Sequence, residues 1–290
     1  MRRAYSFRAA VKAFFHLVIL GVVAHALVFH SRAQVVNLID KTSIASIDLN
    51  NPNPALVGMF QWSVQGQNEL RQQWFWFRVD GNPEVPLNAL GLVGVTPFLG
   101  TRGLSTVYGA GPLNVQIDYL LTGSSAVPIN GLAQSDIQET ITLHNSGTNA
   151  IPLSFFQYSD FDLAGAGNDT ITLGKDPGGL YNSANQSDGV STLTESVSVT
   201  APSASHGEAA LFNATWLKLN DGNPDVLNDN ATAGPGNVTW ALEWDMLLLP
   251  NQDFIISKDK HLQVQIIPEP SLFALLGIGL ASFVLRRQRK

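Results

Sequence analysis

Four oxygen-bearing side chains recur at alternate positions in one polar loop and could bind a hard cation. Asp221, Asn223, Asp225 and Asp229 occupy the first, third, fifth and ninth places of a loop of the EF-hand type. Oxygens at this spacing can converge on Ca²⁺. The sixth place, however, is Val226 in place of glycine, and Thr232 at the twelfth lacks the bidentate carboxylate. A solvated turn is therefore the preferred interpretation, and calcium is the only cofactor that the sequence suggests.

Aromatic and acidic side chains supply two further candidate sites. Trp74 and Trp76 alternate along 72–79 and could form a flat apolar platform for pyranose rings. An interior position is the preferred interpretation, because the opposite face of this stretch is also apolar. The second candidate lies within 159–169, where three acids could also bind calcium: Asp160, Asp162 and Asp169.

The sequence offers little that points to catalysis. It contains no cysteine, which excludes disulfides, thiolate metal sites and a cysteine nucleophile. His144, His206 and His261 lie far apart, and neither a G-x-S-x-G nor an H-E-x-x-H motif occurs. Four carboxyl groups could in principle supply a glycosidase pair, namely Glu139, Glu195, Glu243 and Asp245. Placement at strand ends explains Glu139 and Glu195 more simply, since both lie on otherwise apolar faces, and we expect no enzymatic activity.

The distribution of charge restricts the partners. The chain has 290 residues, with 17 Lys and Arg against 23 Asp and Glu and a net charge of −6. Dense basic clusters occur only near the two ends, so the pattern does not favour nucleic acid as a partner. Roughly 230 residues lie between the ends, which is enough to bury an apolar core without disulfides.

The N-terminal end has the features of a signal peptide. Basic residues begin it, namely Arg2, Arg3, Arg8 and Lys12, and an apolar stretch spans 13–29. Ser31 and Ala33 then match the small residues at positions −3 and −1 of a cut after Ala33. We therefore assign 1–33 to a signal peptide removed by signal peptidase. An uncleaved membrane anchor is the alternative.

The C-terminal end has the features of a short transmembrane helix. Residues 271–285 are uncharged and would extend about 22 Å as a helix, whereas a hydrocarbon core is about 30 Å thick. Basic residues that would stop transfer close the segment: Arg286, Arg287, Arg289 and Lys290. Pro268, Glu269 and Pro270 precede it, and the two prolines keep the backbone extended around the glutamate. Such a peptide suits an enzyme that reads main chain at the membrane surface.

The Pro-Glu-Pro tripeptide, the short apolar segment and the basic cluster together resemble the PEP-CTERM sorting signal. The resemblance covers 266–290, with Ile266 and Ile267 where members of the family often have valine. It implies an exported protein of a Gram-negative bacterium, often one that makes extracellular polysaccharide. It also implies recognition of 268–270 by a membrane-embedded exosortase, which is thought to cut near the motif. The implied location is transient anchoring in the inner membrane, then the envelope, the surface or the extracellular matrix.

Alternating stretches between the two ends predict strands. Period-two patterns occur at 72–79, 113–123, 136–147, 150–161, 191–200, 239–249 and 261–267, separated by Gly, Asn and Pro. Asn145-Ser146-Gly147 is expected to turn the chain back between two of them. In the stretch 239–249, Trp240 and Trp244 are expected inside, with Glu243 and Asp245 on the opposite face. We expect residues 34–265 to form one antiparallel β-sandwich of about ten strands or more.

An Asp-Gly-Asn-Pro tetrapeptide occurs twice, at 80–83 and at 221–224. Each copy follows a stretch that begins with tryptophan and is expected to be a strand. Independent use of a favourable turn is the preferred interpretation over internal duplication, because each of these residue types favours turns for its own reason.

The sequence therefore predicts an exported, non-enzymatic β-sandwich with a structural or exopolysaccharide-associated role. A carbohydrate-binding module is the alternative, and a polysaccharide hydrolase is a weaker one. The expected partners are signal peptidase, exosortase and the membrane, together with polysaccharide.

Overall fold

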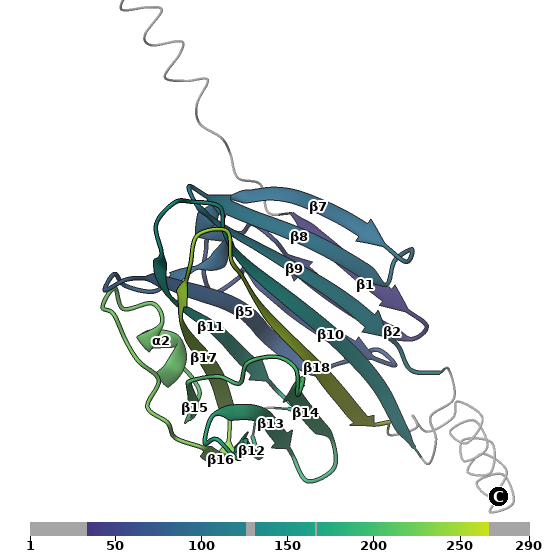
Figure 1. The fold of residues 1–290 in the computed structure, drawn as a ribbon. Helices are drawn as coiled ribbons and strands as arrows, with labels where there is room; N and C mark the ends of the chain where they lie inside the picture. Colours follow the sequence, from purple (N-terminus) through teal and green to yellow (C-terminus); the bar gives the residue numbers. More distant parts are fainter. Residues whose placement is uncertain (1–33, 126–130, 166, 267–290) are drawn as a thin grey trace, which may run out of the picture. The chain divides into compact units, whose positions relative to one another are not determined.

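The computed structural model describes residues 34–125, 131–165 and 167–266, which form an all-β unit of two antiparallel sheets (Figure 1). Sheet A contains nine strands: β1 (Val35–Asp40), β2 (Ser43–Asp48), β3 (Gly58–Val64), β4 (Gln67–Asn68), β5 (Leu70–Val79), β6 (Val85–Pro86), β11 (Ile151–Phe161), β15 (His206–Leu211) and β17 (Val238–Leu248). Sheet B also contains nine: β7 (Leu92–Phe98), β8 (Gly103–Ala110), β9 (Leu113–Thr122), β10 (Leu132–Asn145), β12 (Asp169–Lys175), β13 (Tyr181–Ser187), β14 (Thr192–Val197), β16 (Thr232–Gly236) and β18 (Asp253–Gln265). The predicted signal peptide and the segment 267–290 lie outside the described residues.

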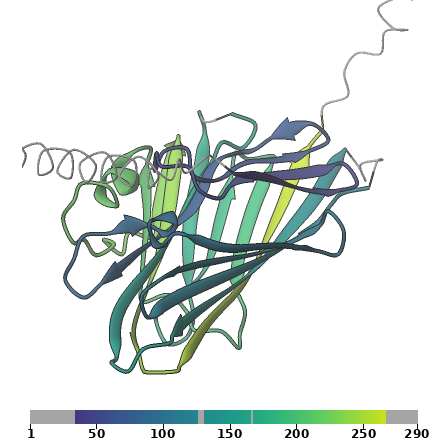
Figure 2. The same ribbon diagram turned by 90° about the horizontal axis from the view of Figure 1, so that it is seen from above.

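The order of strands interleaves distant parts of the sequence. The main path of sheet A runs β1-β2-β3-β5-β11-β17-β15, and that of sheet B runs β16-β12-β13-β14-β18-β10-β9-β8-β7. β18 therefore lies in the interior of sheet B, where it pairs with β14 on one side and β10 on the other. The strand is yellow in Figure 2, with earlier strands on both sides. The seven stretches predicted from alternation all contain strands, although β14 ends at Val197 within 191–200, and the all-β prediction is confirmed.

The turn at Asn145 does not form the expected hairpin. β10 belongs to sheet B and β11 to sheet A, so the residues between them carry the chain from one sheet to the other. The Asn145 amide holds this crossing together, because its Nδ2 donates to the carbonyls of Asn149 at 2.8 Å and Leu248 at 2.9 Å. Its Oδ1 accepts the Gly147 N–H at 2.9 Å. The sequence correctly predicted that the strand ends at these polar residues. Their local pattern did not show that the next strand belongs to the other sheet.

The inner faces of the two sheets make the core. The Trp62 indole on β3 donates to the Ser135 hydroxyl on β10 at 3.0 Å, and the rings of Phe75 and Phe155 stack at 5.5 Å. Five tryptophans are fully buried: Trp62, Trp74, Trp76, Trp240 and Trp244. Removal of one such side chain from water stabilises the fold by roughly 1.5–3 kcal/mol. Burial of Trp240 and Trp244 agrees with the prediction from alternation.

Sheet A is buried on both faces over much of its centre. All residues of β5 from Gln72 to Phe77 are buried, and so are those of β17 from Val238 to Trp244. The placement of Glu243 opposite the tryptophans is therefore right, but that opposite face is not a solvent face at Glu243, which is 0% exposed. Loops that pack over this face of the sheet account for the difference.

Four charged side chains form a fully buried group between the sheets, here called the core charge cluster: Glu139, Glu195, Lys258 and Lys260. Lys260 Nζ lies 2.7 Å from Glu139 Oε2 and 3.0 Å from Glu195 Oε2, and Lys258 Nζ also contacts Glu139 Oε2. The expectation that both glutamates lie at strand ends was wrong. Each faces a lysine of β18 in register, Glu139 opposite Lys258 and Glu195 opposite Lys260. The interior therefore carries two balanced ion pairs.

Burial and charge act in opposite directions on the pKa of Glu139. Removal from water alone would raise it, but attraction by the ammonium groups of Lys258 and Lys260 prevails and lowers the pKa to about 2. Burial lowers the pKa of Lys258 to about 8, against the attraction of the two carboxylates. A further tie to sheet A comes from the Gln157 amide, which donates to Glu195 Oε2 at 2.8 Å. The cluster thus joins the two sheets by polar contacts.

The second Asp-Gly-Asn-Pro copy does not follow a strand. Residues 214–218 form the short helix α2 (Ala214–Lys218), which contains Trp216, whereas the first copy does follow β5. The two contexts differ, in agreement with independent use of a turn sequence. A 3-10 helix, η1 (Leu87–Leu90), follows the first copy. No helix among the described residues has the length and apolar character needed to cross a membrane.

Candidate functional site

A cleft of about 570 Å³ lies over sheet A and is the candidate binding site. Its floor comes from β5 and β11, which contribute Arg71, Gln72, Tyr158 and Asp160. One wall is formed by β1 to β3 and the loop that joins β2 to β3, and the other by residues 212–216 around the start of α2. The walls thus come from segments about 150 residues apart in the sequence, brought together by the order of strands in sheet A.

A buried carboxylate lies at the floor of the cleft. The Asp160 side chain is only 3% exposed, and its Oδ2 lies 3.5 Å from the Nε of Arg71. Its Oδ1 has no hydrogen-bond partner among the described residues. Burial and the nearby charge of Asp162 raise the pKa of Asp160 to about 7, only partly offset by Arg71 and the Tyr158 hydroxyl. The floor therefore offers a hydrogen-bond acceptor without a protein donor.

Aromatic rings line the walls above this floor. Phe60 on β3 is 39% exposed and Phe212 after β15 is 38% exposed, and Trp216 of α2 is half-buried. The guanidinium of Arg71 lies over the Phe212 ring, 5.3 Å from its centroid. Cation–π contact of this kind fixes both side chains against one another. The cleft thus combines apolar flat surfaces with a polar floor.

Hydrogen bonds to the backbone hold the first wall in place. Asp48 at the end of β2 accepts the N–H of Asn50 at 3.2 Å and the Asn51 side-chain amide at 2.9 Å. From the floor, the Gln72 amide donates to the carbonyls of Pro54 at 2.8 Å and Val57 at 2.9 Å. Both oxygens of Asp48 are used in this way, so this carboxylate is committed to shaping the loop.

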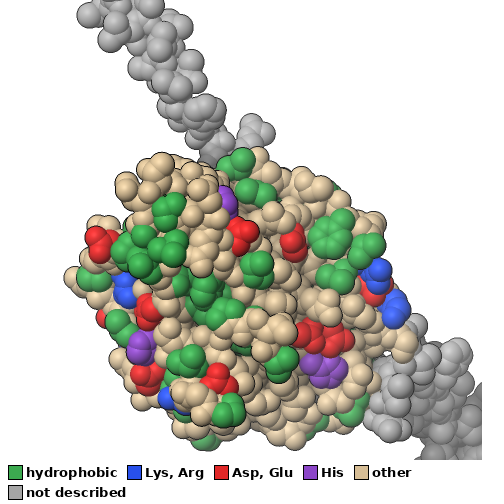
Figure 3. Space-filling model, viewed as in Figure 1, with side chains coloured by type: hydrophobic (Ala, Val, Ile, Leu, Met, Phe, Trp, Pro, Cys, Tyr) green, Lys and Arg blue, Asp and Glu red, His purple; other side chains and the backbone are tan. Residues whose placement is uncertain are grey.

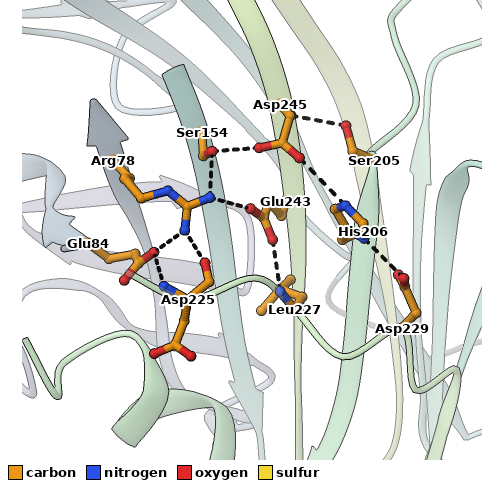
Figure 4. A network of polar contacts seen from close by, with 10 residues as sticks. All are labelled: Arg78, Glu84, Ser154, Ser205, His206, Asp225, Leu227, Asp229, Glu243 and Asp245. Carbon is orange, nitrogen blue, oxygen red and sulfur yellow. Dashed lines mark hydrogen bonds and ion pairs between the residues drawn. The ribbon is translucent and has the colours of Figure 1, made fainter. Parts of the chain in front are cut away.

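An arginine-centred network anchors the chain after the second wall (Figure 4). Arg78 of β5 lies 2.5 Å from Glu84 and 3.1 Å from Glu243, and it also donates to Ser154 at 2.9 Å. A further bond reaches the carbonyl of Asp225 in the loop after α2. The guanidinium thus joins strands of sheet A to the covering loop.

The buried carboxylates of this network fix the same loop through its backbone. Glu84 accepts the N–H of Asp225 at 2.9 Å, and Glu243 accepts that of Leu227 at 2.9 Å (Figure 4). Glu208 on β15 accepts the Asn228 N–H and the Thr215 hydroxyl, both at 2.8 Å. The segment 213–229, which includes the second wall of the cleft, is therefore pinned to sheet A at several points.

His206 extends the network toward solvent. Its Nδ1 lies 3.0 Å from Asp229 and its Nε2 lies 3.6 Å from Asp245, with the ring one-third exposed (Figure 4). The other two central histidines lie on sheet B, where His144 pairs with Asp253 at 2.6 Å and His261 with Asp136 at 2.7 Å. Both are direct cross-strand pairs of β10 and β18. The structure thus does not bring the three histidines together.

The tryptophans proposed as a sugar platform lie elsewhere. Trp74 and Trp76 are both 0% exposed, so the platform interpretation was wrong and their interior position is confirmed. The Trp74 ring contacts Tyr108 of sheet B edge-on at 5.9 Å, and Trp76 contacts Tyr158 at 6.0 Å. Alternation alone could not show this, because it does not reveal the loops that cover the outer face.

Asp221 and Asp229, two of the side chains proposed to bind calcium, make hydrogen bonds within the protein. Asp221 accepts the backbone N–H of Asn223 at 2.7 Å, as in a solvated turn, and Asp229 faces His206. In the part of the chain that the structure describes, no three His, Asp or Glu side chains are placed to hold a metal ion. Calcium at Asp221, Asn223, Asp225 and Asp229 stays a prediction. Of the three acids within 159–169, Asp160 lies at the floor of the cleft.

The face of the molecule in Figure 3 shows scattered charged side chains among polar and apolar ones. Lys and Arg do not gather there into one patch. The cleft has the same mixed character, with one arginine and two aspartates among its lining residues. Recognition in it would therefore rest on shape, stacking and individual hydrogen bonds rather than on a strong field.

A comparison with protein families matches residues 267–290 to the PEP-CTERM protein-sorting motif. The chain carries a PEP-CTERM sorting motif. The match includes Pro268, Glu269 and Pro270 and the basic residues that follow, and it confirms the resemblance predicted from the sequence. It supports export, a membrane-associated sorting step and processing by an exosortase. No curated protein sequence matches the chain.

Solved structures resemble the chain in fold. A bacterial glucoamylase complexed with acarbose aligns with a TM-score of 0.52 at 10% identity, over 86% of this chain and 36% of that one. A galactose mutarotase-like protein from Lactobacillus casei ATCC 334 aligns at 0.48 and 8% identity, over 79% and 100%. A polysaccharide lyase aligns at 0.44 and 13% identity, over 78% and 33%. This chain thus spans about a third of the glucoamylase, and the likeness concerns the fold alone.

The stability of the protein will fall between pH 5 and pH 8. Burial raises the pKa values of Asp160 and Glu243 to about 7, so the folded state binds more protons than the unfolded state over this range. Their contribution is complete at low pH and is lost as pH rises through 7, by about 1 kcal/mol or more for each group. Urea unfolding at a series of pH values measures this. Asp160→Asn should flatten the slope, and a free energy of unfolding that rises from pH 5 to pH 8 would contradict the assignment.

Proposed function

We propose that the protein is exported through an N-terminal signal peptide, is processed by an exosortase at its C-terminal motif, and associates with extracellular polysaccharide through the cleft of its β ectodomain. The match to the sorting motif supports the first half of this proposal. The cleft supports the second, and the fold likeness to a glucoamylase adds nothing about ligand. The proposed role is structural, in the envelope or the matrix around the cell.

The composition of the cleft favours a saccharide. Pyranose rings present apolar faces that stack on aromatic side chains, and their hydroxyls require buried polar partners. Phe60, Phe212 and Trp216 supply the first of these, and Asp160 with Arg71 supplies the second. A volume of about 570 Å³ lies within the range of small-ligand sites. The observation that carries the proposal is this combination of aromatic walls and a polar floor.

We propose binding rather than cleavage in this cleft. Hydrolysis of a glycosidic bond commonly uses two carboxyl groups, one on each side of the bond. Here Asp48 already accepts two hydrogen bonds from its own loop, and Asp160 is paired with Arg71. The acids with the strongest network partners, Glu84 and Glu243, hold backbone N–H groups under the covering loop. These assignments give Asp48, Glu84 and Glu243 structural uses, so none of the three is free to act beside Asp160 as the second carboxyl group.

Removal of the two exposed rings will weaken saccharide binding by about tenfold or more. Phe60→Ala with Phe212→Ala removes stacking surface from both walls, and each stacked ring contributes about 0.5–1.5 kcal/mol. Binding of the purified ectodomain to a panel of polysaccharides measures the effect. Leu247→Ala is a matched control, since this exposed side chain lies on β17 and does not line the cleft. Equal binding by the double variant and the control would reject the cleft as the site.

Glu269→Ala will block C-terminal processing. Exosortase is expected to read the extended Pro-Glu-Pro peptide, so loss of its only acid should leave the apolar segment attached. Mass spectrometry of the mature protein from a host with active exosortase measures both ends. The native protein should begin at Gln34 and lack Lys290, whereas the variant should begin at Gln34 and retain Lys290 in the membrane fraction. An intact Lys290 in the native protein would contradict the sorting proposal.

A further inference from the structure

The Asp160 carboxylate is buried, incompletely bonded and part of the cleft lining. One oxygen lies 3.5 Å from Arg71 Nε, while Oδ1 has no hydrogen-bond partner among the described residues. A buried acceptor without a donor destabilises the fold, so such groups in native structures call for an explanation. Asp160 also lines the cleft, so a ligand there can supply the donor.

The neighbours of Asp160 determine which donor fits. The guanidinium of Arg71 is held over the Phe212 ring at 5.3 Å and next to the carboxylate, so acceptor and donor lie side by side at the floor. Each sugar hydroxyl both donates and accepts one or more hydrogen bonds. Two adjacent hydroxyls can therefore donate to the carboxylate and accept from the guanidinium while the ring stacks on the wall.

The charges around the floor disfavour an anionic ligand most, and Arg71 opposes a cation at the point of contact with Asp160. An ammonium group would approach Asp160 only by also approaching Arg71, whose charge repels it. A carboxylate on the ligand would meet Asp160, Asp162 and Asp48 near the same cleft. With Asp160 ionised, the Arg71–Asp160 pair is neutral in sum, which suits a ligand without charge.

We infer that the cleft recognises neutral saccharides through a pair of vicinal hydroxyls bound by Asp160 and Arg71, with Asp160 as the specificity-determining residue. The inference rests on the proposed saccharide-binding function and narrows it to a class of sugar and a point of contact. Asp48 and Gln72 act differently, because their polar atoms hold the surrounding loop.

Titration calorimetry of the folded ectodomain with matched oligosaccharides tests this inference. The panel contains a neutral hexasaccharide of glucose, the same oligosaccharide after periodate cleavage of its vicinal diols, an oligogalacturonate and a chitosan oligomer. The native protein should bind the untreated neutral sugar at least about tenfold more tightly than the other three. Preference for either charged sugar, or undiminished binding after periodate treatment, would overturn the inference.

Asp160→Asn supplies the protein side of the test. The change keeps the shape of the side chain but replaces one acceptor oxygen with a donor, so affinity for the neutral sugar should fall at least about tenfold. Asp80→Asn is the control, since this exposed residue lies at positive φ, where asparagine is tolerated. Affinity of Asp160→Asn within twofold of native would overturn the inference. The periodate and charge comparisons decide the matter on native protein if the variant does not fold.

The outcomes distinguish this inference from the proposed saccharide-binding function on which it rests. Binding that is lost in the Phe60→Ala and Phe212→Ala double variant but kept in Asp160→Asn would retain saccharide binding and reject the role of Asp160. Failure of the native protein to bind any saccharide in either panel would reject the proposed function and this inference together.

Discussion

Lys258→Met will destabilise the ectodomain by about 3–5 kcal/mol, because it leaves two buried glutamates with a single lysine. In the native protein, Lys258 and Lys260 balance Glu139 and Glu195 in a region with no solvent access. The variant must either hold a net negative charge in the core or take up a proton there. Urea unfolding followed by tryptophan fluorescence measures the loss.

A second substitution in the same cluster should recover much of this loss. Glu139→Leu with Lys258→Met removes one complete pair and leaves Glu195 with Lys260, which lie 3.0 Å apart. Replacement of a buried ion pair by apolar groups is often nearly neutral, so the double variant should be more stable than Lys258→Met alone. Lys175→Met is the control for loss of an exposed charge. If Lys258→Met costs no more than this control, the cluster does not carry its charges in the folded state.

Arg78→Met will cost about 3–5 kcal/mol and release the covering loop. Glu84 and Glu243 would lose their counter-charge while remaining buried, and the carbonyl of Asp225 would lose its donor. Chemical denaturation measures the stability, and hydrogen exchange measures the loop. Faster exchange is expected at the N–H groups of Asp225 and Leu227, whose acceptors are the two orphaned carboxylates.

Arg71→Met is the matched control for this change. It removes an arginine from the same strand and also breaks an ion pair with a buried aspartate, but the Arg71 side chain is 59% exposed, so the loss should stay near 1 kcal/mol. Similar losses in the two variants would show that the Arg78 network contributes no more than a surface pair. Unchanged exchange at Leu227 in Arg78→Met would show that the loop is held by other contacts.

The strands were predictable because alternation reflects a local property, namely which side of a sheet a residue faces. Ile137, Ile141 and Leu143 alternate along β10, and all three are buried as expected. Whether the opposite face of a strand is buried or exposed to solvent was not predictable in this way. Whether Trp76 or Glu243 meets solvent depends on the loop 219–231, and no periodicity within β5 or β17 reports on that loop.

The core charge cluster and the cleft were missed for a related reason. The sequence around Glu139 does not explain a glutamate on an apolar strand. Its partner Lys258 lies 119 residues later in the sequence and comes opposite Glu139 only through the register of the sheet. Phe60 and Phe212 likewise become neighbours of one cleft only through the order of strands in sheet A. Lysines on the otherwise apolar face of 256–264 were the available signal, since two buried acids require partners. The sorting motif needed no such information, because it is read as a linear peptide.

The place of β18 has a consequence for the order in which the protein can be completed. β18 joins β14 to β10, so a chain that still lacks it has sheet B in two separate halves. Such a chain also has Glu139 and Glu195 without the lysines that neutralise them. Residues 253–265 are therefore required to complete sheet B. They lie immediately before the matched motif at 267–290. A chain that emerges from its N-terminus first can therefore complete the fold only after the residues next to the sorting motif have emerged.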